Sequence, residues 1–212
     1  MSDMGITPGR PLTRTVFKGC NITLVADAMT TNFLHANFFE DLGPAQSVTQ
    51  IPSLCVIDFG RYSFIVNVDG RRAIAADASP ELNEASPVMT MMTAFAQRAT
   101  SALIKAIGFN FIYELGFSQP ATEEFLGRFL RLERFAGFGS ALLSGGFRVV
   151  AQSGDHLSQL TLDPVWDNPL SFSLKINYHF DSPGEGPWVD VVRRFPALTV
   201  DAPGLVERII HA

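Results

Sequence analysis

The sequence predicts an α+β fold in which an antiparallel meander sheet, or two such sheets, packs on a long central helix. The first observation is an apolar segment of helical periodicity at residues 86–108. The second is a set of alternating segments on both sides of it, which is typical of strands that bury one face. The third is the turn residues between these segments, such as Asp69-Gly70, which favour hairpins.

The segment 86–108 has the signals that begin and end a helix. Ser86 is a good N-cap, and Pro87 suits the first helical position. Lys105 is expected in the last turn, near the negative end of the helix dipole, and Gly108 suits the left-handed residue past the end. One apolar stripe follows i, i+3 and i+4 steps and consists of Val88, Met92, Phe95, Ala99, Leu103 and Ile107.

The chain before this helix is predicted to be mostly strand. We expect a strand at 20–27 and a three-stranded meander at 54–59, 62–69 and 71–76. Residues 30–42 have apolar side chains at helix-like spacing, but they fit an irregular aromatic segment equally well.

The chain after the helix repeats this pattern more loosely. The predicted elements are strands at 109–117, 147–152, 156–162 and 170–180, a helix at 120–132, a Gly-rich loop at 135–146, a loop at 163–169, and short helices at 188–195 and 203–210. Both parts therefore run through strands and hairpins to a helix. We predict a flexible N-terminal arm at 1–11 and a single α+β domain at 12–212, divisible into similar halves at 12–118 and 119–212.

Composition favours a large core with apolar surface left over. Hydrophobic residues make up 47% of the chain, charged residues only 17%, and 18 residues are Phe. Apolar surface of this kind favours a homo-oligomer or a protein partner. The net charge of −5, with scattered Lys and Arg, argues against nucleic-acid binding. With no long apolar run and no export signal, we expect no membrane contact, a cytoplasmic location, and Cys20 and Cys55 as small buried hydrophobes.

No motif predicts a catalytic residue, a cofactor or a metal. The stretch from Gly116 to Pro120 has the setting of a nucleophile elbow around Ser118, but Pro120 stands where the elbow needs glycine. Residues 137–142 lack the third glycine of a dinucleotide-binding loop. The four histidines do not show the spacing of a zinc site.

One polar constellation remains as a candidate ligand-binding site. Asn110 and Glu114 lie on the polar face of strand 109–117, and Lys175, Asn177 and His179 lie on the polar face of strand 170–180. If the two strands are neighbours, these five residues line one surface. The alternative is an ordinary solvent-facing face of a sheet.

These observations favour a noncatalytic interaction or scaffold protein that self-associates. The alternative is a small-molecule binding protein with an apolar cavity between helix and sheet, for which Met89, Met91 and Met92 offer an adaptable lining. A long helix packed in a sheet also resembles the hot-dog fold, and this resemblance implies an enzyme acting on a thioester. The chain departs from that family, because no Asp or Glu lies between Pro87 and Gly108.

Overall fold

The computed structural model describes residues 12–98, 104–118, 127, 129, 146–181 and 188–211. The strands of this part of the chain are β1 (Leu12–Ala26), β2 (Ser47–Ile51), β3 (Leu54–Asp58), β4 (Tyr62–Asn67), β5 (Arg72–Asp77), β6 (Ile104–Phe117), β7 (Phe147–Ser153), β8 (His156–Val165) and β9 (Asn168–Asp181). The helices are α1 (Val88–Arg98), α3 (Trp188–Val192), α4 (Phe195–His211) and the short 3-10 helix η1 (Glu40–Leu42).

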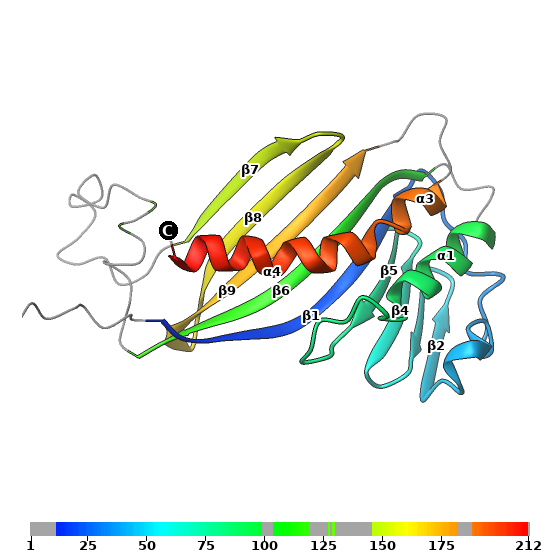
Figure 1. The fold of residues 1–212 in the computed structure, drawn as a ribbon. Coiled ribbons are helices and arrows are strands. Elements are labelled where there is room, and N and C mark those ends of the chain that lie inside the picture. Colours follow the sequence, from blue (N-terminus) through cyan, green and yellow to red (C-terminus); the bar gives the residue numbers. More distant parts are fainter. Residues whose placement is uncertain are drawn as a thin grey trace, which may run out of the picture.

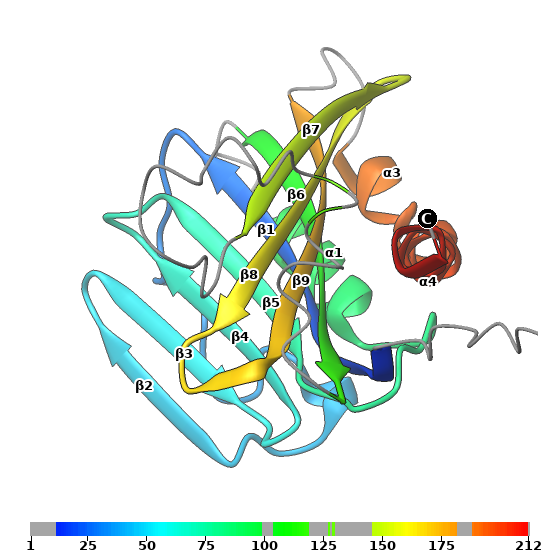
Figure 2. The same ribbon diagram turned by 90° about the vertical axis from the view of Figure 1, so that its left-hand side faces the viewer.

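The nine strands form one antiparallel sheet in the order β2-β3-β4-β5-β1-β6-β9-β8-β7 (Figure 1). The predicted antiparallel sheet is therefore confirmed. Helices α1, α3 and α4 lie on one side of it, as Figures 1 and 2 show together. Ring contacts agree, because Phe95 of α1 packs on Phe64 of β4 and Phe195 of α4 stacks on Phe111 of β6. We call this side the helix-covered face and the other side the open face.

The longest strands, β1, β6 and β9, lie next to one another at the centre of the sheet. The predicted alternation of β6 is confirmed. Its aromatic and leucine side chains point to the helix-covered face and are at most 5% exposed: Phe109, Phe111, Tyr113, Leu115 and Phe117. Asn110 and Glu114 point to the open face, because successive side chains of a strand alternate. The core is thus the layer between β6, its neighbouring strands and the helices.

The predicted long central helix is wrong. α1 ends at Arg98, and residues 104–108 belong to β6, where Ile104 pairs with Ala26 and Ile107 with Leu24. A short apolar run fits helix and strand periods alike. The β-branched Ile107 pairs with Leu24 on one side and Phe180 on the other, which favours the strand. The first part of the predicted stripe is confirmed, since Val88, Met92 and Phe95 are buried.

The first meander has one more strand than predicted. The additional strand is β2, which lies at the edge of the sheet with all five residues exposed. Its sequence, Ser-Val-Thr-Gln-Ile, lacks the alternation of a half-buried strand, so periodicity did not reveal it. Residues 30–42 adopt the irregular aromatic alternative, with turns, η1, and buried Leu34 and Phe39.

The C-terminal helices also differ from the prediction. The chain forms α3 and then a 17-residue α4 that contains Pro203, where two short helices were expected. Proline removes one helical hydrogen bond. Burial of Ala202, Val206 and Ile209 against the sheet keeps the helix continuous. The predicted loop at 163–169 is a tight hairpin, because β8 reaches Val165 and β9 begins at Asn168.

The predicted burial of both cysteines is confirmed. Cys20 is 4% exposed, Cys55 is 0% exposed, and both are free thiols. They lie three strands apart, at least about 14 Å, which is too far for a disulfide. The predicted arm at 1–11 and helix at 120–132 fall on residues that, apart from 127 and 129, lie outside the described part. In that part, no helix is long and apolar enough to cross a membrane.

A buried carboxylate at the end of β5 fastens α1 to the sheet. Asp77 is 3% exposed and accepts hydrogen bonds from the backbone and side chain of Ser79 and from the Ser86 hydroxyl, the last at 2.6 Å. Arg61 Nε lies 3.6 Å from the same carboxylate. Gly19, at a bulge in β1 with φ of 141°, leaves the necessary room, since a Cβ there would lie 2.6 Å from the Asp77 carbonyl oxygen.

Replacing Asp77 by alanine should lower the free energy of unfolding by about 3 kcal/mol, because the buried donors of Ser79 and Ser86 lose their acceptor. Urea denaturation measures this change. Asp69→Ala is the control, since Asp69 is exposed in the β4–β5 turn and should change stability by less than about 0.5 kcal/mol. Equal stability of the two variants would contradict a structural role for Asp77.

Candidate functional site

The structure places all five residues of the predicted polar constellation on the open face of two neighbouring strands. β6 and β9 pair antiparallel, with Asn110 opposite Asn177 and Gly108 opposite His179. Lys175 lies opposite Ile112, and Glu114 lies two pairs further along, opposite Ser173. The two strands are thus neighbours, as the prediction required.

The asparagines of this face bond to one another in a ladder. Asn177 Nδ2 donates to Asn110 Oδ1 at 2.8 Å, and Asn110 Nδ2 donates to Asn21 Oδ1 at 2.8 Å. The Thr23 hydroxyl donates to the same Asn21 oxygen. The ladder therefore joins β9, β6 and β1 across the centre of the sheet, and much of its hydrogen-bonding capacity is used internally.

The charged members of the constellation are paired as well. Glu114 accepts from Lys18 at 2.8 Å and from Arg14 at 3.2 Å, and the bond from Lys18 holds the pKa of Glu114 below its usual range. Lys175 lies 3.3 Å from Asp163, and His179 lies 3.0 Å from Asp181. Each of the five predicted residues thus has a partner on the sheet, and a ligand-binding role for them stays a prediction.

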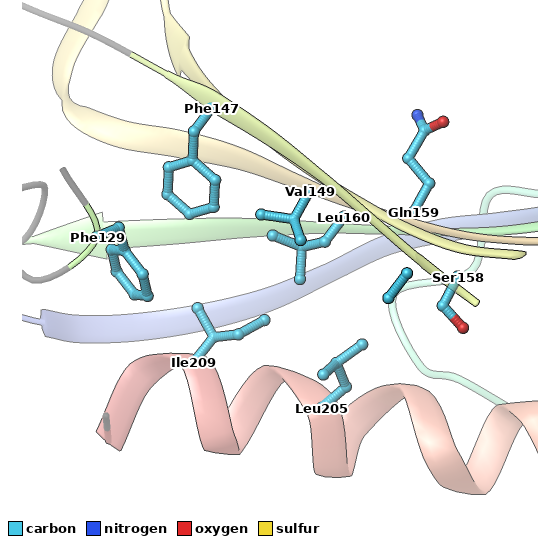
Figure 3. Close-up of a pocket in the computed structure, with 9 residues that line it drawn as sticks. Phe129, Phe147, Val149, Ser158, Gln159, Leu160, Leu205 and Ile209 are labelled. Atoms are coloured by element: carbon cyan, nitrogen blue, oxygen red, sulfur yellow. The ribbon is translucent and has the colours of Figure 1, made fainter. Parts of the chain in front are cut away.

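A different feature, which sequence reasoning missed, is an apolar groove between α4 and the β7–β8 hairpin. Its volume is about 240 Å³. Figure 3 shows Leu205 and Ile209 pointing from α4 toward the hairpin, and Phe147, Val149 and Leu160 pointing back toward the helix. The remaining lining residues are Phe129, Ala151, Ser158 and Gln159, of which Gln159 points its amide away from the groove.

The groove exists because α4 packs over the centre of the sheet and leaves β7 uncovered. α4 contacts β6, and Ile209 is buried, whereas Val149 on the helix-covered face of β7 is 51% exposed. None of the lining residues has a titratable side chain. The groove can therefore hold an apolar group by burial alone. In the sequence, only the i, i+4 spacing of Leu205 and Ile209 pointed to this face of the helix.

Two polar contacts join α4 and the segment just before it to the sheet. Arg194 Nη1, just before α4, donates to Asp155 Oδ2 at the tip of the β7–β8 hairpin at 2.6 Å, and this bond lowers the pKa of Asp155. In the middle of α4, Asp201 accepts from the Tyr178 hydroxyl of β9 at 2.6 Å. Both contacts tie α4 to the sheet, so the groove is built into the fold.

Comparisons with known proteins add no function to this geometry. No protein-family model matches the chain, and no curated protein matches it. The groove and the polar face are therefore assessed on their own physical features. Within the described residues, no group of three or more His, Cys, Asp or Glu side chains is arranged to hold a metal ion.

Replacing Lys18 by methionine should raise the pKa of Glu114 toward its ordinary value, because the largest stabilising contact of the carboxylate is lost. Carboxyl-carbon NMR titration measures this shift. The wild type gains stability from Glu114 above the ordinary pKa and loses it as the pH falls through the lower folded pKa. The variant should lose less stability in that acid window.

Lys105→Met is the matched control, since Lys105 pairs with Asp27 at 3.1 Å and makes no contact with Glu114. If the Glu114 titration midpoint is the same in both variants, the Lys18 contact does not set it.

Proposed function

We propose that this protein is a noncatalytic binding protein that holds an apolar group in the groove between α4 and the β7–β8 hairpin. The observation that carries the proposal is the lining of the groove, in which aliphatic and phenyl side chains from a helix and two strands converge. Apolar pockets with few polar groups are the usual binding sites for small molecules. This agrees with the predicted alternative of a cavity between helix and sheet, although the helix is α4.

The size of the groove limits what it accepts. Its volume of about 240 Å³ is below the range of about 300–1,000 Å³ that is common for ligand pockets. An alkyl segment or one or two apolar side chains of a partner fit such a space better than a large cofactor. Each buried methylene contributes about 0.8 kcal/mol, so a short alkyl chain is enough for measurable binding.

The described residues give less support to the thioester-enzyme alternative. The long helix on which the hot-dog resemblance depended ends at Arg98. Burial raises the pKa of the Cys20 thiol to about 12, so this cysteine stays protonated at neutral pH and is a poor nucleophile. The groove lining offers no acid or base for proton transfer.

Titration with 1-octanol, followed by methyl NMR, tests the proposal. We expect shifts confined to groove methyl groups such as those of Leu205, Ile209 and Val149. Leu205→Gln should weaken octanol binding at least tenfold, about 1.4 kcal/mol, because it leaves an unpaired amide among apolar walls.

Val200→Gln is the matched control, because Val200 is 71% exposed on the same helix and does not line the groove. Its octanol affinity should equal that of the wild type. Shifts spread over the whole surface, or an equal loss in both variants, would overturn the proposed site.

A further inference from the structure

β7 is an open edge of the sheet with little protection against pairing. Within the described residues, no strand pairs with its outer side. Val149 and Val150, which point to opposite faces, are 51% and 52% exposed. Natural edge strands are usually protected by charges, proline or bulges. β7 has seven residues, no proline, no register shift against β8 and one charged residue, Arg148.

We propose that two copies of this chain pair antiparallel along β7, about a two-fold axis at Val150, so that each copy covers the open side of the other's groove. This register sets Val150 opposite Val150, Val149 opposite Ala151, and Arg148 opposite Gln152 of the other copy. Three apolar pairs thus meet, one of Val150 with Val150 and two of Val149 with Ala151. The Arg148 of each copy faces an amide that can accept its hydrogen bond. A two-fold interface requires such self-complementarity, because the same surface serves both partners.

The opposite edge of the sheet is less suited to this pairing. β2 has five residues and is followed directly by Pro52, which has no N–H to donate. A two-fold axis at its central residue, Thr49, would set Ser47 opposite Ile51 and Val48 opposite Gln50. Each of these pairs joins a polar to an apolar side chain. The comparison favours β7.

The second copy would add residues to the groove. Val149 and Ala151 line the groove on the helix-covered face of β7. In the paired sheet, the same two residues of the other copy continue that face past the edge. The apolar walls then extend from one α4 to the other under a continuous sheet. This last step rests on the proposed function, whereas the pairing itself does not.

Sedimentation without ligand tests the pairing. We expect the wild type to have twice the monomer mass of 23.2 kDa, and Val150→Lys to be monomeric because two like charges would meet on the axis. Thr49→Lys, the matched change at the centre of β2, should remain a dimer. A monomeric wild type, or a dimer that dissociates with Thr49→Lys and not with Val150→Lys, would overturn the proposal.

A cross-link tests the register independently of stability. Directly opposed strand residues have Cα atoms about 4.5–5.5 Å apart, so Val150→Cys should form an intermolecular disulfide on mild oxidation. Arg148→Cys should not, because the two copies of that residue would lie about 14 Å apart. Native Cys20 and Cys55 are buried and do not interfere. Equal cross-linking of both variants would exclude this register.

Octanol affinity shows whether a failed test counts against the pairing of β7 or against the proposed binding function of the groove. Val150 points away from the groove, so Val150→Lys should still bind octanol, but three- to tenfold more weakly than the dimer. Equal affinities would overturn the shared groove. If neither form binds octanol while the wild type is a dimer cross-linked at Val150→Cys, the groove function fails and the pairing stands.

Discussion

The width of the sheet relative to the helices decides where this protein has accessible apolar surface. Nine strands at about 4.8 Å spacing span roughly 38 Å, whereas a helix with its side chains is about 10–12 Å across. α1 packs on β5 and β1, and α3 and α4 pack on β6, so the helices cover the middle of the sheet. These helices do not cover the edge strands β2 and β7. The groove lies where the cover of α4 ends.

Polar contacts, one buried and one partly exposed, help determine where the helices sit on this wide sheet. Apolar packing alone would allow a helix to slide, since the helix-covered face is apolar along β1, β6 and β9. Asp77 fixes the start of α1 through Ser86, and Tyr178 fixes the middle of α4 through Asp201. Breaking the contact at Asp77 leaves buried polar groups without a partner and destabilises the fold, whereas the exposed Asp201 can bond to water instead. These contacts therefore favour one position for each helix.

Much of the sheet could be predicted from the sequence, whereas the groove could not. β4, β6 and β9 bury one face, so their alternation is visible in the chain. Ile104 and Ile107 were misassigned because their run fits both periods, and Pro203 suggested a helix start that tertiary packing overrides. The polar face was predictable because the strands of Asn110 and Asn177 are both central. The groove depends on how far α4 extends over β8 and β7, and no local sequence pattern predicts this.

Because the helices cover only part of the sheet, the groove lies next to the exposed edge strand β7. Along β9 and β6, apolar side chains are buried on the helix-covered face, and the open face is mostly polar, with Ile112 half-buried among polar neighbours, so neither face exposes a large apolar surface. At β7 this separation fails, because Val149 and Val150 expose apolar surface on both faces of a strand whose outer side has no pairing partner among the described residues. Pairing with another strand would give the outer backbone groups of β7 hydrogen-bond partners and would bury part of both valine side chains. A small apolar ligand in the groove would cover Val149 but not Val150. The edge of β7 and the groove therefore suit different partners, a second strand and a small apolar group.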